Sequence, residues 1–367
     1  MQFPSNESIS TLSSTLIAAI CTLIIVPMMC LRCVARKSSR KSMEDAGVEI
    51  SAEKGQVIGC YKANKVILNH PAQEEGNGDS LTPVLSPQSG MTIDQSLRSS
   101  INVLFARFVN LEENSVDYQG LKNSSEWAEY EKQARRLSGQ SKEVQELLAT
   151  LPGDANQRKA FFLNLYNSMV IHGKIVLGTP STLLQRLYFY ATTSYNVGGL
   201  ILSLNDIENG ILRANRPSAV PFAKPQFNFS QTSEKTEFTR SLVLQDVDPR
   251  IHFALNCGAK SCPPIRFYDP TKLDQQLDKA TRGFMKANTK VIQSKNDNTI
   301  VITLSKLLDY YKGDFGQNNI DILKWICQYA KEEQKEKIQN NILSTFQKSD
   351  SNFEFKYSEY DWSSNSL

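Results

Sequence analysis

The chain has 367 residues, of which 40% are hydrophobic and 22% are charged, so most of it can build a core. Its length suits a tail, a linker and one large or two small domains. The formal net charge of +3 is too small to favour a nucleic-acid-binding surface or an acidic substrate, and no nucleic-acid partner is expected.

An uncharged, largely apolar segment runs from Ser8 to Leu31. Its strictly apolar part, Leu16 to Met29, is interrupted by Thr22 and Pro27. About 20 apolar residues cross a bilayer as a helix, and this segment reaches that length only when its Ser and Thr residues are counted. The pattern predicts one transmembrane helix over residues 9–31, with the lipid bilayer as its partner.

The charges that flank this segment predict its direction. Only Glu7 precedes it, whereas five cations follow it closely: Arg32, Arg36, Lys37, Arg40 and Lys41. Because positive charge stays on the cytosolic side, we expect residues 1–8 outside and the main domain in the cytosol. A cleaved signal peptide is the alternative, but it would have basic residues before the apolar run and a small-x-small site after it, and neither is present.

Residues 32–95 are expected to form a flexible basic and polar linker. They are rich in Ser, Lys, Glu, Gly and Pro, and their one strand-like stretch is Lys65 to Leu68. So low a hydrophobic density does not offset the entropy that is lost on ordering. The pattern changes near residue 96, so residues 96–367 are predicted to be the globular domain.

Helical patterns dominate the first half of that domain. Apolar residues recur at helical spacing from Ile101 to Leu111, and another helix is expected after the capping pair Asn123 and Glu126. A long helix is predicted from Asn156 to about Leu177. Its middle, Ala160 to Asn167, is apolar almost all round, which is typical of a helix at the centre of a large domain.

Strand patterns are interspersed in the second half. The expected strands are Val197 to Leu204 with a Gly-Gly turn, Ile251 to Asn256, Asn298 to Leu304, and Phe353 to Tyr357. The expected helices are Asn205 to Arg213, Ser305 to Lys312, and Ile320 to Asn340. Pro217 to Thr239 is predicted to be a surface loop. Together these elements favour an α+β fold with helices packed on a mainly antiparallel sheet.

The densest set of reactive side chains lies between Asp248 and Pro264. His252 is on a predicted strand, and a Gly-containing loop with Cys257 and Cys262 follows. A thiol, an imidazole and exposed backbone N–H groups are the parts of a Cys–His nucleophilic site. On a regular strand His252 and Cys257 would face opposite sides, so the nucleophile is open between the two thiols.

Two other interpretations of this segment remain open. One is a buried strand with packed thiols, because a free Cys is commonly a small core residue. The other is a metal site made of His252, Cys257 and Cys262. This metal signal is weak, because structural zinc usually takes four ligands with more closely spaced Cys pairs. We therefore expect no metal and no other cofactor.

Two carboxylates are candidates to orient the imidazole: Glu208 on a predicted helix, and Asp361 near the C-terminus. On the long helix, Asn164, Ser168 and His172 are spaced i, i+4, i+8, a polar stripe that is either a satisfied network or a pocket lining. The candidate catalytic residues are His252, Cys257, Cys262, Glu208 and Asp361. The candidate binding residues are Asn164, Asn167, His172 and Arg250.

Five segments in this order resemble the signatures of a known family. They are Ala160 to Asn167, Tyr195 to Gly199 with Ser203 to Arg213, Asp248 to Pro264, Leu304-Ser305 with Tyr310 to Gly316, and Tyr360 to Ser363. The family is the one catalogued as domain of unknown function 547, and the resemblance covers about residues 98–365. It implies a domain but no settled activity.

The order of a central helix, a His-bearing strand and a late Asp is also similar to papain- or transglutaminase-like cysteine hydrolases. In those enzymes the nucleophilic Cys opens the central helix, where this chain has Lys159, Ala160 and Phe161. One hypothesis is therefore a thiol-dependent hydrolase or acyltransferase that acts on a peptide substrate. The other is a non-catalytic scaffold or regulatory domain that binds a protein partner, since the family's domain occurs beside leucine-zipper and signalling segments. Whether the protein is an enzyme stays open.

Overall fold

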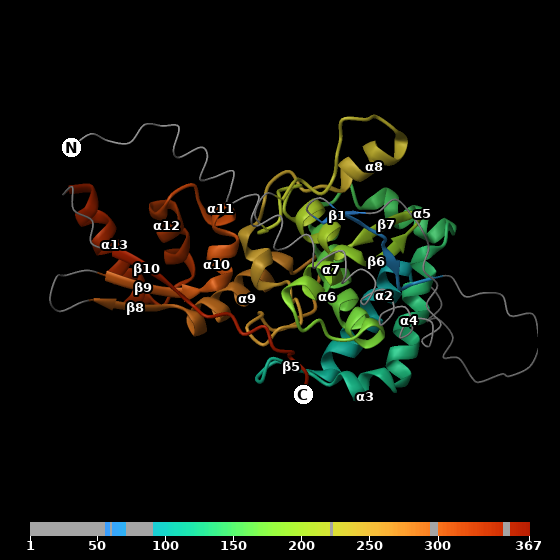
Figure 1. Ribbon diagram of the computed structural model, residues 1–367, viewed down its shortest axis with the longest axis horizontal. Helices are drawn as coiled ribbons and strands as arrows, with labels where there is room; N and C mark the ends of the chain where they lie inside the picture. The colour runs from blue at the N-terminus through green and yellow to red at the C-terminus, as the bar shows by residue number, and fades with distance from the viewer. Residues whose placement is uncertain (1–55, 59–60, 71–90, 221–222, 294–299, 348–352) are drawn as a thin grey trace, which may run out of the picture. The chain divides into compact units, whose positions relative to one another are not determined.

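The computed structural model describes residues 56–58, 61–70, 91–220, 223–293, 300–347 and 353–367 (Figure 1). Its helices are α2 (Ile93–Phe108), α3 (Tyr118–Lys122), α4 (Ser125–Ser138), α5 (Lys142–Thr150), α6 (Ala155–Leu177), α7 (Leu183–Thr192), the π-helix η1 (Asp206–Leu212), α8 (Glu234–Leu242), the 3₁₀-helix η2 (Pro249–Phe253), α9 (Leu273–Asn288), α10 (Lys306–Tyr310), α11 (Lys312–Phe315), α12 (Asn319–Tyr329) and α13 (Glu332–Gln347). Its strands are β1 (Gln56–Ile58), β2 (Tyr61–Ala63), β3 (Val66–Ile67), β4 (Val109–Asn110), β5 (Ser115–Val116), β6 (Thr193–Val197), β7 (Leu200–Ser203), β8 (Lys290–Gln293), β9 (Ile300–Ser305) and β10 (Phe353–Ser358).

The α+β class is confirmed, but the described strands form several short sheets in place of one. One sheet has the order β3-β6-β7 and another the order β10-β9-β8, while β1-β2 and β4-β5 are separate pairs. The pairs β3-β6 and β9-β10 are parallel, and the other described pairs are antiparallel. Strands this short cannot bury a core by themselves, so helices carry most of the packing.

Helix α6 is the central helix that the sequence predicts. The Asp154 side chain caps its first turn by accepting hydrogen bonds from the N–H groups of Asn156 and Gln157. Every side chain from Ala160 to Lys174 is buried. A helix buried on all faces lies between other elements, and α6 contacts α2, α3, β6 and η1.

The predicted strand and turn near Val197 form the β6-β7 hairpin. Gly198 and Gly199 have φ angles of +59° and +93°, so they make a two-residue turn that favours glycine at both positions. A Cβ on Gly198 would also lie 2.4 Å from a methyl group of Leu148. The hairpin delivers Tyr195 to the core beside α6.

A second apolar cluster is built from later elements. Phe253 is fully buried there, with ring contacts to Phe284 of α9, Phe315 of α11 and Trp325 of α12. The helix expected from Ile320 to Asn340 is divided into α12 and α13, because the backbone is extended at Ala330. The predicted strands near 298–304 and 353–357 are present as β9 and β10.

The expected strand at 251–256 is wrong. Residues 249–253 form η2, which Asp248 caps by accepting a hydrogen bond from the Arg250 N–H group. Pro249 at the first helical position favours this turn, because its fixed φ suits a helix start. His252 is therefore delivered by a helical turn rather than by a strand.

Part of the predicted linker packs against the domain. Val66 and Ile67 are buried, and β3 pairs with β6. The buried Asn69 side chain donates to the carbonyls of Ala134 and Asn196. Hydrogen bonds to the carbonyls of two other elements hold this segment in place although the surrounding sequence is polar.

The transmembrane prediction is corrected. No helix in the described part of the chain is long and apolar enough to cross a membrane. The span predicted over residues 9–31, the tail 1–8 and residues 32–55 lie outside the described residues. The physical weakness of the prediction is the short apolar run of Leu16 to Met29, which falls below the ~20 residues of a spanning helix. The single-pass location with a cytosolic domain, which rested on that helix, is corrected with it.

Two asparagines of α6 position the segment that contains the thiols. Asn167 donates to the carbonyl of Ala254 at 2.9 Å and accepts from the N–H group of Asn256 at 2.9 Å. Three residues earlier on the same helix, Asn164 donates to the carbonyl of Tyr268 and accepts from its N–H group. Both amides are buried, so they replace the backbone partners that a strand would have supplied.

We predict that Asn167→Ala lowers the free energy of unfolding by about 2–4 kcal/mol, because it leaves a buried carbonyl and a buried N–H group without partners. Urea unfolding monitored by circular dichroism measures the change. Asn156→Ala, at an exposed position of the same helix, is the matched control and should change stability by less than about 0.5 kcal/mol. Equal stability of the two variants would refute the role of Asn167.

Candidate functional site

Cys257 and Cys262 lie at the two ends of one tight loop. Their Sγ atoms are 2.6 Å apart, and the N–H group of Cys257 donates to Cys262 Sγ at 3.2 Å. Both are free thiols; Cys257 is half-buried and Cys262 is buried. The loop therefore holds two sulfurs in direct contact, with one of them nearer to solvent.

The side chain of Asn256 closes this loop. It accepts from the N–H group of Gly258 at 2.7 Å and donates to the carbonyl of Pro263 at 2.7 Å. Gly258 has a φ angle of +84°, and a Cβ there would lie 2.9 Å from the Lys174 side chain. Glycine is thus required both by the backbone conformation and by the close approach of Lys174.

The C-terminal segment, residues 358–367, packs on the other side of the loop. The N–H groups of Lys260 and Ser261 donate to the carbonyls of Ser363 and Asp361. The Tyr360 hydroxyl lies 3.2 Å from Cys262 Sγ and 3.7 Å from Cys257 Sγ. Burial raises the pKa of Tyr360 well above its ordinary value, so its hydroxyl keeps its proton and can donate to a thiolate.

Lys174 of α6 links the loop to the C-terminal segment. Its Nζ donates to Gly258 O, Ser364 Oγ and Asn365 Oδ1, all within 3.0 Å. Burial lowers the pKa of Lys174 to about 8, while the nearby thiols favour its charged form. At neutral pH the ammonium therefore places a positive charge beside the sulfurs.

The two thiols differ in acidity. The hydrogen bond between them is the largest of the effects that lower the pKa of Cys257 to about 7, and the Tyr360 hydroxyl and the Ala259 N–H group also contribute. Burial, and the negative charge that Cys257 takes on, raise the pKa of Cys262 well above its ordinary value. The pair thus favours a thiolate on Cys257 and a proton on Cys262.

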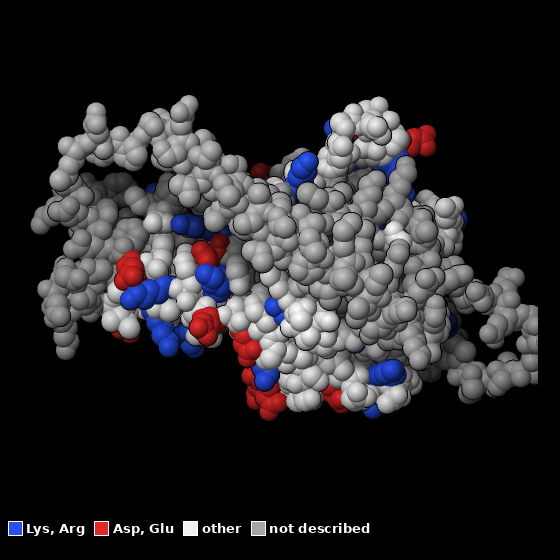
Figure 2. Space-filling view, in the orientation of Figure 1, with Lys and Arg blue, Asp and Glu red and all other residues white. Residues whose placement is uncertain are grey.

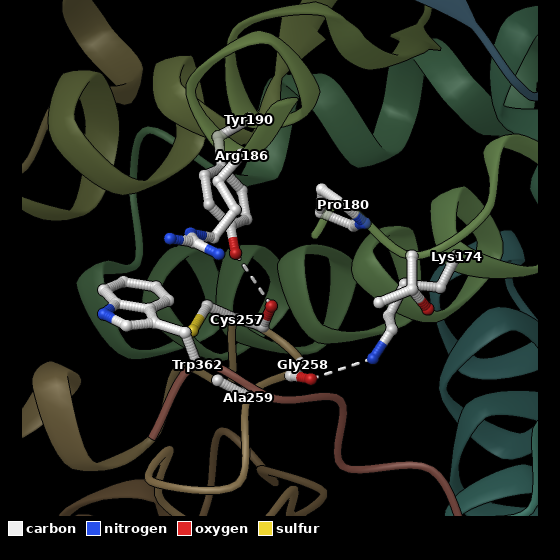
Figure 3. A pocket seen from close by; sticks show the side chains of 9 residues that line it. Lys174, Pro180, Arg186, Tyr190, Cys257, Gly258, Ala259 and Trp362 are labelled. Carbon is white, nitrogen blue, oxygen red and sulfur yellow. Dashed lines mark hydrogen bonds between the residues drawn. The ribbon is translucent and has the colours of Figure 1, made fainter. Parts of the chain in front are cut away.

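A shallow pocket, open to solvent, lies beside Cys257 (Figure 3). Its lining includes Lys174, Pro180, Arg186, Tyr190, Trp362 and the loop residues Cys257 to Ala259. The Tyr190 hydroxyl donates to the carbonyl of Cys257 at 2.9 Å and fixes one wall. Of the two cysteines, Cys257 is the one that lines the pocket and that an incoming molecule meets.

His252 belongs to a different buried group. Its Nε2 lies 2.8 Å from Asp314 Oδ2, and its ring stacks on Tyr311 with centroids 4.0 Å apart. Arg213 donates to both oxygens of the same carboxylate. Among the described contacts none joins His252 to either thiol, so the structure does not bring the predicted Cys–His pair together.

Burial and hydrogen bonds together determine the protonation states of His252 and Asp314. Burial is the largest effect on the pKa of His252 and lowers it, although Asp314 opposes the shift. Burial alone would raise the pKa of Asp314, but the hydrogen bonds from His252 and Arg213 hold it well below its usual range. Asp314 is thus a buried carboxylate with three partners, His252, Arg213 and Arg216, and the two arginines are always charged.

The two carboxylates expected to orient an imidazole lie elsewhere. Glu208 accepts from the hydroxyls of Tyr166 at 2.8 Å and Tyr311 at 2.5 Å. Asp361 is exposed; its carboxylate accepts from the Ser363 N–H group, and this hydrogen bond shapes the turn beside the thiol loop. Of the predicted catalytic residues, the structure brings together only Cys257 and Cys262, with the backbone of Asp361 nearby.

The predicted binding residues are placed apart from the pocket. Asn164 and Asn167 hold backbone, as described above. His172 lies 2.6 Å from the Tyr195 hydroxyl through Nδ1, and burial lowers its pKa to about 3, so it is a neutral core residue.

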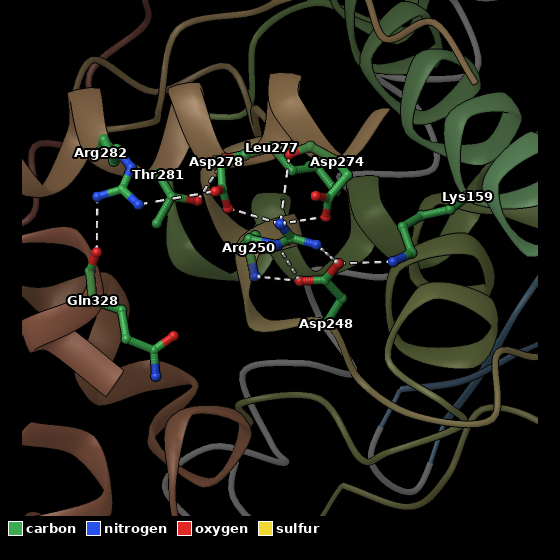
Figure 4. A network of polar contacts seen from close by, with 9 residues as sticks. All are labelled: Lys159, Asp248, Arg250, Asp274, Leu277, Asp278, Thr281, Arg282 and Gln328. Atoms are coloured by element: carbon green, nitrogen blue, oxygen red, sulfur yellow. Dashed lines mark hydrogen bonds and ion pairs between the residues drawn. The ribbon is translucent and has the colours of Figure 1, made fainter. Parts of the chain in front are cut away.

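Arg250 is engaged in a surface network (Figure 4). Its guanidinium pairs with Asp248, Asp274 and Asp278, and Asp248 also pairs with Lys159 of α6. This network ties η2 to α9 and α6. On the face that Figure 2 shows, described Lys and Arg side chains lie among Asp and Glu side chains, in agreement with the small net charge.

Several residues of the site have no sequence signal for their role. Tyr360, Trp362 and Asp314 stand inside segments that resemble the family, but nothing in the spacing joins them to Cys262, to the pocket or to His252. Lys174 carried a usable signal, because it is a lysine two residues after His172 in the largely apolar C-terminal half of α6. Arg186 and Tyr190 lie on α7, a helix that was not predicted.

Residues 152–285 match the model of the family described as "Protein of unknown function, DUF547". The match spans α6, the β6-β7 hairpin, η1, η2 and the thiol loop, and it confirms the resemblance over those residues. A domain of this family is therefore present. No curated protein and no solved structure matches the chain, so the similarity to papain- or transglutaminase-like hydrolases stays a prediction.

We predict that Asp314→Asn lowers the free energy of unfolding by about 3–5 kcal/mol, because it leaves the buried Arg213 charge without its partner. Since the folded state depresses the pKa of Asp314, its contribution is present above about pH 4 and is lost as the pH falls further. Urea unfolding at pH 7 and at pH 3.5 measures both effects.

The matched control is Glu237→Gln, which removes a carboxylate from an exposed ion pair with Arg240. It should change stability by no more than about 1 kcal/mol. If the free energies of unfolding of wild type and Asp314→Asn differ by the same amount at both pH values, the ionised carboxylate of Asp314 does not contribute as predicted.

Proposed function

We propose that Cys257 and Cys262 form a redox-active dithiol that exchanges with disulfide bonds. The observation that carries the proposal is the direct contact of the two sulfurs, 2.6 Å apart, beside an open pocket. A disulfide needs its sulfurs at about 2.05 Å, so only a small movement of the loop separates the dithiol from the bonded form.

The difference between the thiols supports separate roles for them. Cys257 is half-buried, lines the pocket and has a pKa of about 7, so it is the attacking thiolate. A thiol whose pKa lies near the ambient pH combines a useful thiolate fraction with good nucleophilicity. Cys262 is buried and protonated, so it is the thiol that resolves the intermediate.

The exchange consists of two displacements. The Cys257 thiolate attacks one sulfur of a substrate disulfide, forms a mixed disulfide and releases the first substrate thiolate, which takes a proton from solvent. Cys262 then loses its proton to solvent and attacks Cys257 Sγ, which releases the second substrate thiolate. The substrate disulfide gains two electrons, and the protein dithiol becomes a disulfide. A second dithiol, as an external reductant, reverses both steps.

The hydrolase and acyltransferase hypothesis has less support. It needs a base at the thiol, but the His252 ring nitrogen is bonded to Asp314 and no described contact takes it to Cys257. It also needs free N–H groups for an oxyanion. In this loop the N–H groups of residues 257, 258, 260, 261 and 262 already have acceptors. Thiol–disulfide exchange requires neither a base nor an oxyanion site.

We predict that 2-hydroxyethyl disulfide converts the dithiol of the full chain into a Cys257–Cys262 disulfide. Trypsin cleaves after Lys260, between the two thiols, so this bond joins peptide 251–260 to peptide 261–266. Mass spectrometry without reductant detects the joined peptides. With Cys262→Ser, the mixed disulfide should accumulate on Cys257, because the resolving thiol is absent.

Cys257→Ser is the matched variant and should leave Cys262 unmodified over the same time, because Cys262 is buried and protonated. Cys327, buried in α12, is an internal control and should also stay reduced. If neither domain thiol reacts, dithiol exchange is refuted, and the scaffold or regulatory domain with an unknown protein partner is the hypothesis that is left.

We also predict that the rate of alkylation of Cys257 by iodoacetamide rises with pH around a midpoint near 7. In Cys262→Ala the midpoint should move toward the ordinary value of about 9, because the hydrogen bond from Cys262 is the largest cause of the shift. Peptide mapping of 251–260 against pH measures it. An unchanged midpoint in the variant would contradict the coupling of the two thiols.

A further inference from the structure

The pocket beside Cys257 contains an arginine with unused hydrogen-bonding capacity. Arg186 stands in the first turn of α7, and its guanidinium lies 4.7 Å from the ring centroid of Trp362. Its Nη1 donates to the carbonyl of Ser181 at 3.1 Å. Its Nε is shielded from solvent and has no partner among the described residues. No described carboxylate forms an ion pair with Arg186, unlike Arg213 and Arg250.

The charge that lines the pocket has one sign. Lys174 and Arg186 contribute two cations, and no Asp or Glu is among the lining residues. Figure 3 shows Arg186 beside Trp362 on one side and Lys174 on the other, with Cys257 between them. The three donor contacts of Lys174 are directed at the loop and the C-terminal segment, so Arg186 is the cation that can bond a ligand directly.

The remaining walls suit a small molecule. Trp362, Tyr190 and Pro180 offer apolar surface around the thiol. Trp362 is held in place by ring contacts with Tyr360 and Tyr310 as well as by Arg186. Part of this pocket is open to solvent, so a bound disulfide would extend out of it.

We infer that the disulfide that reacts with Cys257 is a low-molecular-weight compound with a carboxylate, and that Arg186 binds this carboxylate through its guanidinium group. The inference rests on the dithiol function proposed above and adds the substrate class. A planar guanidinium matches a carboxylate with two parallel hydrogen bonds, and a flanking ammonium strengthens the attraction. A cationic disulfide would meet two like charges in the same pocket.

Three disulfides of similar size and different charge test the inference: 3,3′-dithiodipropionate (anionic), 2-hydroxyethyl disulfide (neutral) and cystamine (cationic). The second-order rate of Cys257–Cys262 bond formation is measured for each on the full chain at pH 7. Each rate is divided by the rate of the same disulfide with 2-mercaptoethanol, a reference thiol without a carboxylate, which corrects for differences in intrinsic reactivity. We expect the anionic compound to exceed the cationic one by at least about 10-fold, the ratio that one charge-assisted hydrogen bond supports.

Two arginine variants separate the effect of the Arg186 charge in the pocket from the effect of the protein's overall charge. Arg186→Gln should bring the three normalised rates to within about 3-fold of one another. Arg240→Gln, which removes a half-exposed cation of α8 paired with Glu237, should leave the preference unchanged. Raising the salt concentration should reduce the preference only in part, because a direct hydrogen bond is screened less than a distant charge.

The outcomes distinguish this inference from the function on which it rests. If the three compounds react at equal normalised rates, or if Arg186→Gln keeps the preference, carboxylate recognition by Arg186 is overturned while dithiol exchange stands. If none of the three forms the Cys257–Cys262 bond, the proposed function fails and the inference fails with it.

Discussion

The side-chain amides of Asn164 and Asn167 are the contacts on which the site depends. Their four hydrogen bonds to backbone groups fasten the segment from Ala254 to Tyr268 along the buried helix α6. Asn256 then closes the loop inside that segment. A regular sheet would hold such a segment by backbone pairing, whereas here three asparagines bend it into a loop that brings two thiols into contact.

The two groups of reactive side chains, the imidazole with its partners and the two thiols, have different roles. The imidazole of His252 is stacked, buried and bonded to Asp314, so it stabilises the junction of η2 and α11. Of the two thiols, Cys257 lines a pocket with cations and aromatic rings, and Cys262 lies buried behind it. Because a thiolate on Cys257 is favoured by Cys262, Tyr360 and the Ala259 amide, the dithiol does not need the imidazole. Asp248, His252 and Cys257 lie in one short stretch of sequence, but they do not form a catalytic triad.

α6, the β6-β7 hairpin, β10 and the family resemblance can be predicted from the sequence, because each has a strong local pattern. It failed at 251–256, where an apolar run bounded by Pro249 takes a 3₁₀ turn that tertiary contacts with Asn167 hold in place. It also could not pair His252 with Asp314, or Cys262 with Tyr360, since these partners lie 62 and 98 residues apart. Periodicity reports faces of helices and strands, and such long-range side-chain contacts leave no trace in it.

The most direct measurement is the redox state of the two thiols in glutathione buffers of increasing oxidised fraction. Differential alkylation followed by peptide mapping counts reduced Cys257 and reduced Cys262 separately, with Cys327 as an internal reference. The account predicts that Cys257 and Cys262 oxidise together in one reversible two-electron transition, with joined peptides 251–260 and 261–266, while Cys327 stays reduced. Glutathione bound stably to Cys257 beside a reduced Cys262 would contradict it.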